Sequence, residues 1–432
     1  MLATHSCRAS PTLTRTTWKR FSSSYRTVKG FPLPPASLPS HATNHTHKEF
    51  DVLFLRQQGA KFPKWHLTPP IRRDTRVRLS YGASVAASDL LGKQILDRTV
   101  DDQGRAVAIH EPTLASYIVN SERSATPIYP SDADTIVSLL DINVTRPGED
   151  DGPAEAPFEV FEAGTGMGSL SLHIARALHA ANPPVPAALR LALRSSPLAR
   201  SVAGNVLDLD AASAALLAAY RASRRAVLHT LDRSGKHTRA AYKLVRHFRR
   251  AQYLADMDFH VGSVDAYVSA RLAASAGAPV FARAVLDLPA AHAHADALVR
   301  ALHPNGVLVV FNPSVSQVAE FQAWALERQL PLQLEKVLEL PTTSTADGVR
   351  DGGCGGRHWD VKIVKPKPVP PMEEGLEDGV EDECPTESEP VVVMRPKVGG
   401  RVAGGGFVAV YRKWPAGTNR QPAAKPETEP EP

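Results

Sequence analysis

The 432-residue sequence has little cysteine and no long run of apolar residues. Cys7, Cys354 and Cys384 are too few for a disulfide framework and lack the paired spacing of a zinc site, so we expect no metal centre. No segment approaches the roughly 20 consecutive apolar residues of a membrane-spanning helix, so no membrane contact is expected. Wholesale disorder and a collagen-like fold are excluded, because 43% of the residues are hydrophobic and only 22% are charged.

Acidic residues are absent from the first 48 positions, which contain seven Lys and Arg. This leader is rich in Ser and Thr and lacks the apolar centre of a secretory signal, a composition typical of a mitochondrial transit peptide. A basic tail that contacts RNA is the alternative. The opposite composition is found from Met372 onward, where twelve acidic residues stand against seven basic ones. We therefore treat residues 1–48 as a disordered leader and residues 416–432 as a disordered tail.

Residues 49–120 predict a small all-β domain. The segments 50–59, 76–86 and 104–119 are short and rich in Val, Leu and Tyr, and glycine or Asp-Asp turns separate them. They lie too close together for helices between the strands. No acid–base pair or nucleophile stands out in this region.

Residues 121–415 change to an alternation of strands and helices. A helix is expected at 132–142, then a strand, a glycine-rich turn and a helix at 158–178, and further strands at 226–232, 257–261, 281–289 and 306–313. This order predicts an α/β fold with a parallel, doubly wound sheet. Ligands of such sheets bind at the carboxyl ends of the strands. Two insertions interrupt the pattern, 183–225 (helical or partly disordered) and 365–405 (a disordered loop).

The glycine-rich turn at 162–169 is the first chemical signal. Glycines at alternate positions let the backbone approach a ligand, and the following helix offers free N–H groups. A dinucleotide fold would need its third glycine at 169, where Ser169 stands. The pattern instead resembles motif I of class I S-adenosylmethionine-dependent methyltransferases; a purely structural turn is the alternative. The turn reads Glu162, Ala163, Gly164, Thr165, Gly166, Met167, Gly168, Ser169.

Three further strand ends support a nucleoside-containing ligand. Asp232 ends the second strand, where a carboxylate can accept both ribose hydroxyls, unless it only caps the next helix. Asp287 follows the fourth strand within Asp-Leu-Pro, which alone could be a simple turn. Phe311-Asn312-Pro313 ends the fifth strand and also resembles a helix start.

Together these segments resemble the catalytic subunits of tRNA (adenine-58-N1)-methyltransferases, from about residue 50 to residue 414. The resemblance rests on the segments 123–130, 89–93, 286–289 and 311–318, and on Asp132. It implies a Rossmann-like class I methyltransferase domain behind a small β-domain, S-adenosylmethionine as cofactor, tRNA as substrate, and a tetramer, homomeric or with a non-catalytic paralogue. The implied cofactor-binding residues are Ile128, Glu162, Ala163, Gly164, Thr165, Gly166, Met167, Gly168, Ser169, Asp232, His237, Gly262, Ser263 and Asp287.

The sequence departs from the family pattern at several of these positions. Ser263 stands where the family has an Asp that contacts adenine, and Asp232 replaces the usual eukaryotic Glu. His237 occupies a position that is usually basic. The C-terminal signature has become Gly404-Gly405-Gly406-Phe407, which puts the interface built there in question.

Asp287 is the predicted catalytic residue. Adenine N1 is neutral and nucleophilic, so no strong base is needed, and a carboxylate that accepts a hydrogen bond from N6 would stabilise the developing cation. N1 lies on the Watson–Crick edge, so the adenine must first be unpaired.

Binding of tRNA is expected to depend on charge. Residues 190–250 contain thirteen Lys and Arg against three Asp, although a solvated helix surface would look similar. The cations that we singled out are Arg224, Arg225, Lys243, Arg246, Arg249 and Arg250. Two other functions stay open: a non-catalytic RNA-binding partner subunit, and a class I methyltransferase that acts on protein or small molecules.

The composition of the leader predicts its destination. We expect residues 1–48 fused to a fluorescent protein to enter mitochondria, because the segment has seven cations and no anion. The same fusion with its Arg and Lys residues changed to Gln is the control and should stay outside. Nuclear or diffuse fluorescence of the first fusion would contradict the mitochondrial assignment and favour the nucleus.

Overall fold

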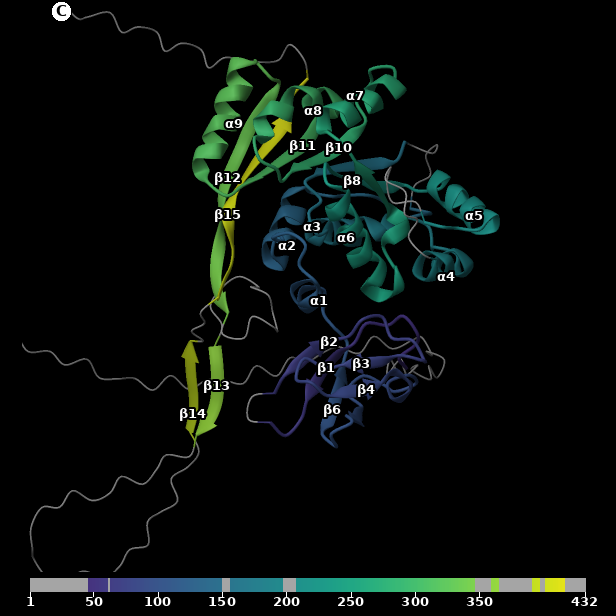
Figure 1. Cartoon of the computed structure of the whole chain (residues 1–432). Coiled ribbons are helices and arrows are strands. Elements are labelled where there is room, and N and C mark those ends of the chain that lie inside the picture. Colours follow the sequence, from purple (N-terminus) through teal and green to yellow (C-terminus); the bar gives the residue numbers. More distant parts are fainter. Residues whose placement is uncertain are drawn as a thin grey trace, which may run out of the picture. The chain divides into compact units, whose positions relative to one another are not determined.

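The computed structural model describes residues 46–60, 63–149, 156–196, 207–345, 359–364, 391–396 and 401–415 (Figure 1). The predicted tail at 416–432 lies outside these ranges, as does all but the end of the predicted leader. His47 already belongs to the folded β-domain, since its backbone N–H donates to Lys93 O at 2.8 Å and its carbonyl accepts from Gly92 N at 2.9 Å. Within the described residues, no helix combines the length and the apolar character needed to cross a membrane.

The β-domain is built from short antiparallel strands. β1 (Phe54–Gln57), β2 (Trp65–Leu67), β5 (Arg98–Val100) and β6 (Ala106–His110) form a sheet in the order β2-β1-β6-β5, and β3 (Arg76–Arg78) pairs with β4 (Ser84–Ala86). Its core contains Leu53, Leu55, Val77 and Ile109.

The last strand of this domain is shorter than the sequence suggests. The apolar run to residue 119 changes to helix α1 (Leu114–Asn120). Thr113 causes the change, because its side chain accepts a hydrogen bond from Ser116 N at 3.1 Å and caps the helix.

The second sheet has seven strands in the order β12-β15-β11-β10-β7-β8-β9. β7 to β11 run parallel, and β15 runs antiparallel to both β11 and β12. This topology confirms the Rossmann-like α/β fold expected from the sequence. The strands are β7 (Phe158–Ala163), β8 (Ala226–Asp232), β9 (Met257–Val261), β10 (Phe281–Leu286), β11 (Leu302–Asn312), β12 (Leu332–Thr345) and β15 (Arg401–Lys413).

Successive strand residues serve two separate cores, one on each face of the sheet. Val160 and Val309 belong to one core, and their neighbours Phe161 and Val310 belong to the other. This period of two is what a sheet covered by helices on both faces requires. The first core includes residues of α1, α2 (Pro130–Leu139), α3 (Ser169–Leu178), α4 (Ala187–Ser195), α5 (Ala211–Ala222) and α6 (Gly235–His247). The second includes residues of α7 (Val264–Ala274), α8 (Ala295–Ala301) and α9 (Val315–Glu327).

The insertion at 183–225 folds into α4 and α5, and a buried carboxylate fixes it to the domain. Asp256 accepts hydrogen bonds from Tyr220 Oη at 2.7 Å and Asn182 Nδ2 at 2.8 Å, and its second oxygen lies 2.7 Å from His179 Nδ1. Because Tyr220 lies on α5, this network links the inserted helix to the start of β9.

The second insertion, expected as a loop at 365–405, is partly strand. β14 (Val391–Pro396) pairs antiparallel with β13 (Trp359–Val364), and β15 begins at Arg401. The Pro and Gly content suggested a loop, but the run Val391–Met394 favours a strand once β13 supplies a partner. Residues 365–390 lie outside the described chain.

Candidate functional site

The predicted glycine-rich turn joins β7 to α3 and requires its glycines for conformational reasons. Gly164, Gly166 and Gly168 have φ angles of +99°, +53° and +90°, which side chains other than glycine rarely adopt. Two of the three glycines also permit close packing inside the protein. A Cβ on Gly164 would lie 1.9 Å from the Asp287 carbonyl oxygen, and one on Gly168 would lie 2.8 Å from Ala241 Cβ.

Gly166 is different, because its nearest neighbours are an ordinary contact distance away. A Cβ there would lie 3.8 Å from Ala125 Cβ and 3.9 Å from Gly164 O. The sequence suggested that all three glycines let a ligand approach. The geometry leaves this role to Gly166 and gives Gly164 and Gly168 a packing role.

Glu162 lies behind the turn and is 1% exposed. Its carboxylate accepts hydrogen bonds from Ser171 Oγ at 2.5 Å and Thr230 Oγ1 at 2.7 Å, and Thr230 Oγ1 lies 2.6 Å from Thr165 Oγ1. Burial, with smaller contributions from Asp287 and Asp232, raises the pKa of Glu162 to about 7. Glu162 therefore supports the loop through Thr230 and Thr165. Sequence reasoning missed Ser171 and Thr230, since neither belongs to a recognisable motif.

Asp232 ends β8 beside the turn and fixes it. Its Oδ2 accepts from Gly166 N at 3.0 Å and lies 3.4 Å from His237 Nδ1, while Oδ1 accepts from Ser234 N at 2.8 Å. The cap of α6 is Ser234, whose Oγ accepts from His237 N at 3.5 Å. Asp232 is therefore not the N-cap of α6. A carboxylate has about four lone-pair positions, so Asp232 can still accept hydrogen bonds from ribose hydroxyls.

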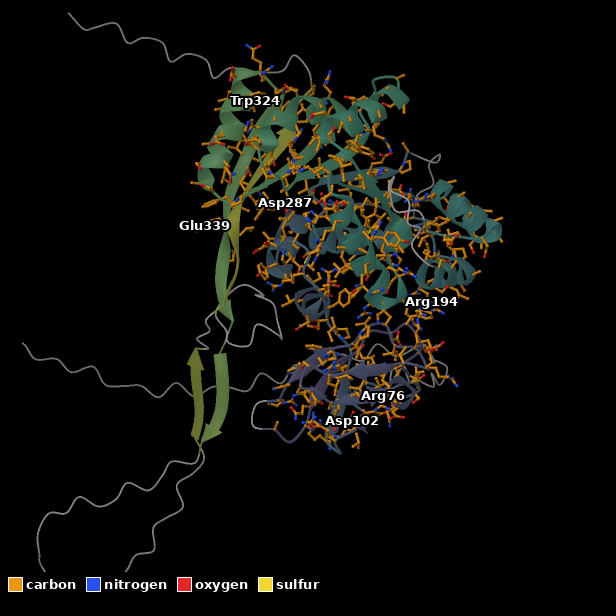
Figure 2. All side chains as sticks on the ribbon, viewed as in Figure 1. Arg76, Asp102, Arg194, Asp287, Trp324 and Glu339 are labelled. Carbon is orange, nitrogen blue, oxygen red and sulfur yellow. The ribbon has the colours of Figure 1, made fainter. Side chains whose placement is uncertain are left out.

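Asp287 follows β10 and is half-buried. Its backbone N–H donates to Ala163 O at 2.9 Å, which fixes it beside the end of β7. Figure 2 labels Asp287. Burial, and secondly the negative charge of Asp232, raises the pKa of Asp287 to about 7. Within the described chain no donor bonds its carboxylate, so the group is available to a ligand.

Other predicted cofactor residues are held to the glycine turn or to Asp232 by hydrogen bonds. Ser169 Oγ donates to Ile128 O at 2.5 Å and ties the segment before β7 to the turn; Ile128, Met167 and Ala163 are buried. Gly262 N donates to Asp232 O at 3.1 Å and so places the end of β9 beside Asp232.

Ser263, which replaces the family's Asp, is exposed at the end of β9. It caps α7 by accepting from Ala266 N at 3.2 Å. A helix cap is thus its role in this structure, and an adenine contact at this position stays a prediction.

The altered C-terminal signature forms the part of β15 that lies next to Asn312. Gly405 and Gly406 have φ angles of +99° and +112°, and a Cβ on Gly406 would lie 2.9 Å from the Phe311 ring. Gly405 also contacts Asp132, whose carboxyl accepts a hydrogen bond from the Gly405 backbone. This bond lowers the pKa of Asp132, but burial has the larger effect and raises it to about 6. The glycines therefore let β15 pass close to the end of β11.

Most of the predicted phosphate-binding cations already have protein partners. Arg224 pairs with Asp258 at 2.6 Å, Lys243 with Glu122 at 3.1 Å, Arg249 with Glu111 at 3.1 Å and Arg250 with Asp51 at 3.2 Å. Arg225 donates to Thr145 at 2.7 Å. Arg246 donates to the Arg194 carbonyl at 2.9 Å, and no acid pairs with it within the described chain.

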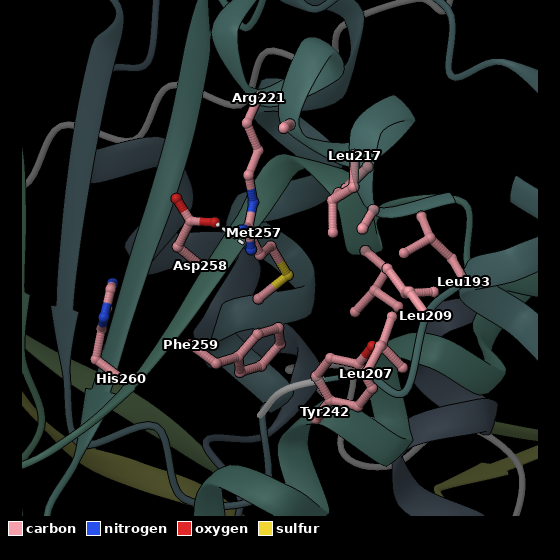
Figure 3. Close-up of a pocket in the computed structure, with 14 residues that line it drawn as sticks. Leu193, Leu207, Leu209, Leu217, Arg221, Tyr242, Met257, Asp258, Phe259 and His260 are labelled. Atoms are coloured by element: carbon pink, nitrogen blue, oxygen red, sulfur yellow. Dashed lines mark ion pairs between the residues drawn. The ribbon is translucent and has the colours of Figure 1, made fainter. Parts of the chain in front are cut away.

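A cavity of about 880 Å³ lies away from this site, between α5 and the edge strand β9 (Figure 3). Its lining is mainly apolar and includes Leu217, Met257 and Phe259, with Arg221 paired to Asp258 at 3.1 Å beside it. None of the predicted cofactor residues lines it. No group of His, Cys, Asp and Glu suited to a metal ion occurs among the described residues.

Comparison with known proteins finds two curated relatives, and both are named as tRNA methyltransferases. No family model matches. The tRNA (adenine(58)-N(1))-methyltransferase TrmI of Thermus thermophilus is 26% identical over 260 residues, which cover 60% of this chain and 70% of the relative. TrmI of a second strain of the same species gives the same values.

Solved structures of low sequence identity are also similar. A SAM-dependent O-methyltransferase from Thermotoga maritima has a TM-score of 0.49 at 15% identity and covers 87% of this chain and 96% of its own. The tRNA (m1A58) methyltransferase TrmI from Aquifex aeolicus has a TM-score of 0.46 at 14% identity, with 86% and 100% covered.

The different surroundings of the glycines predict different costs of substitution. Gly164→Ala should lower the free energy of unfolding by about 3 kcal/mol or more, because the new Cβ meets backbone that must move. Gly166→Ala has room and should cost only about 1–2 kcal/mol, from its left-handed φ. Urea denaturation of both variants measures the difference. Equal losses would show that Gly164 is not packed against Asp287.

Proposed function

We propose that this chain, which is similar to tRNA (adenine(58)-N(1))-methyltransferases, methylates N1 of the T-loop adenine 58 of tRNA. The observation that carries the proposal is the position of Asp287. Its carboxylate, which no described residue bonds, stands beside the glycine turn and Asp232, at the carboxyl ends of adjacent parallel strands. A group that must contact both a cofactor and a base is expected at this place.

S-adenosylmethionine is the methyl donor in this proposal, and it supplies the methyl group on a positively charged sulfonium. The residues fit such a ligand in two respects. Gly166 leaves space where the backbone must approach it, and Asp232 offers carboxylate oxygens for ribose hydroxyls. The negative charge of neighbouring acids also adds to burial in raising the pKa of Glu162 and of Asp287, and such a site favours a cationic ligand.

Asp287 would act on the adenine. Its carboxylate accepts a hydrogen bond from N6, orients the ring, and stabilises the positive charge that spreads over N1 and N6 during methyl transfer. The half-buried position strengthens this interaction, because the effective dielectric constant there is lower than in water. The packing of Gly164 against the Asp287 peptide holds the carboxylate in place, so little reorganisation is needed.

Assembly and location belong to the same proposal. A tetramer, formed by this chain alone or with a non-catalytic paralogue, stays a prediction that analytical ultracentrifugation can test. The mitochondrial location also stays a prediction.

The proposal is tested with the purified full chain, labelled S-adenosylmethionine and an unmodified tRNA transcript. We expect label in 1-methyladenosine, identified by nucleoside mass spectrometry, and none when adenine 58 is replaced by uridine. Label in the protein would instead support the protein methyltransferase. Absence of label although S-adenosylmethionine and tRNA both bind would support a non-catalytic subunit.

Asp287→Asn should separate catalysis from binding. The change keeps an acceptor oxygen but removes the charge, so the single-turnover rate on saturating tRNA should fall ~10²–10³-fold, far more than tRNA affinity changes. The wild-type rate should rise between about pH 6 and 8 as the carboxyl, with its pKa near 7, ionises.

Glu162 titrates in the same range and must be distinguished from Asp287. We expect the pH dependence to disappear in Asp287→Asn and to persist in Glu162→Gln. Asp296→Asn on α8 is the control for loss of one carboxylate and should behave as wild type. A wild-type rate in Asp287→Asn would show that this carboxylate does not stabilise the cation.

A further inference from the structure

Three arginines meet in a small pocket whose lining contains no acid. The pocket has a volume of about 150 Å³ and is lined by Phe50, Pro70, Arg72, Arg194, Arg246 and His247. We call it the arginine pocket. At roughly 30 Å³ per water molecule, it holds about five waters, enough room for one phosphate group.

The cations of this pocket lack the partners that neutralise their neighbours. Arg194 Nε and Arg246 Nε are both buried without a hydrogen-bond partner in the described structure. The other end of the Arg246 guanidinium donates to the Arg194 carbonyl, at 2.9 Å. By contrast, Arg249 and Arg250 nearby pair with Glu111 and Asp51. Arg224 Nε is buried in the same way although Arg224 pairs with Asp258. What distinguishes the arginine pocket is therefore that no acid is among its lining residues, which leaves its guanidinium groups to an anionic ligand.

Phe50 organises two of the arginines. The guanidinium carbons of Arg72 and Arg194 lie 5.2 and 5.3 Å from the centre of its ring. Phe50 itself has a φ of +69°, an unfavourable backbone conformation for a bulky residue. Its N–H donates to Ile71 O at 2.8 Å, which holds the strained conformation. Strain kept in a folded protein in order to place a side chain is typical of binding sites.

The electrostatic balance favours an anion. Burial is the main cause that lowers the pKa of Arg194 and Arg246. Arg250 lowers the pKa of Arg194 further, against the opposite effect of Asp51 and Glu49, and Arg72 lowers that of Arg246, against the opposite effect of Tyr242. Burial, together with Arg246, Lys243 and Arg72, lowers the pKa of His247 to about 4, so its imidazole is neutral near pH 7 and one ring N–H can donate. Three guanidinium forks and an imidazole match the several acceptor oxygens of a phosphate.

We propose that the arginine pocket binds a backbone phosphate of the tRNA substrate. The proposal rests on the proposed function, which makes RNA the polyanion to be bound. It assigns the contact to a pocket to which α4 of the insertion contributes Arg194, a residue that Figure 2 labels. The arginine pocket thereby takes the place of most of the cations in residues 190–250 that the sequence suggested as phosphate contacts, because those cations already have protein partners.

The test compares two double variants that remove the same charge. Arg72→Ala with Arg194→Ala should weaken tRNA binding ~10-fold at low salt and reduce the slope of log K against log salt by about 1. Arg98→Ala with Arg300→Ala removes two exposed arginines on β5 and α8 and should leave both quantities nearly unchanged. Filter binding over a range of salt concentrations measures them.

Additional measurements keep the test independent of folding and of the proposed function. S-adenosylmethionine affinity should be equal in both double variants, which shows that each is folded. Arg72→Lys with Arg194→Lys should keep the salt slope but lose part of the affinity, because lysine lacks the guanidinium fork. Inorganic phosphate, exchanged for chloride at constant ionic strength, should compete with tRNA on the wild type more than on the alanine pair.

The outcomes separate the two proposals. If the wild type methylates tRNA but the two double alanine variants bind it equally well, the arginine pocket is not a phosphate site and the proposed function stands. If phosphate competes with tRNA equally on the wild type and on the Arg72→Ala/Arg194→Ala variant, the anion binds elsewhere and the inference is wrong. If the wild type neither binds nor methylates tRNA, the proposed function fails and the inference fails with it.

Discussion

The contact between Gly164 and the peptide of Asp287 is the constraint on which the site depends. The two backbones approach so closely that no side chain fits at position 164. This contact joins the end of β10 to the start of the glycine turn, and the hydrogen bond from Asp287 N to Ala163 O reinforces it. The positions of Asp287, Asp232 and Gly166 relative to one another follow from it. A side chain at position 164 would therefore displace Asp287 as much as the glycine turn itself.

The same arrangement brings three carboxylates together at a cost in stability. The pKa of Glu162 and of Asp287 is raised to about 7, well above the values near 4 of the unfolded chain. Between about pH 4 and 7 the folded protein therefore binds more protons than the unfolded chain, and its stability falls as pH rises through this window. A cationic ligand at the site offsets that cost, so the charge that destabilises the free protein favours the complex.

The sequence was sufficient to predict the main elements because their signals are local. The runs 226–232 and 257–261 coincide with β8 and β9, and the turn at 162–169 lies where strand and helix meet. The separate tasks of Gly164, Gly166 and Gly168 could not be predicted, since they depend on what packs against each one. The sequence also could not show that most of the cations in residues 190–250 are paired, because Asp258 lies beside Arg224 and Glu122 beside Lys243 only in the folded protein. The role of Phe50 could not be predicted either, since it depends on a backbone φ angle that no sequence pattern indicates.

The position of β15 has a consequence for biosynthesis. This strand comes last among the described elements, yet it lies between β11 and β12 and pairs with both. Val408 and Val410 belong to the core on one face, Ala409 and Tyr411 to the core on the other. A ribosome-bound chain that ends before residue 401 therefore has open edges on β11 and β12 and gaps in both cores. Such edges are templates for aggregation, so the nascent protein depends on protection until β15 has been synthesised and has paired with both strands.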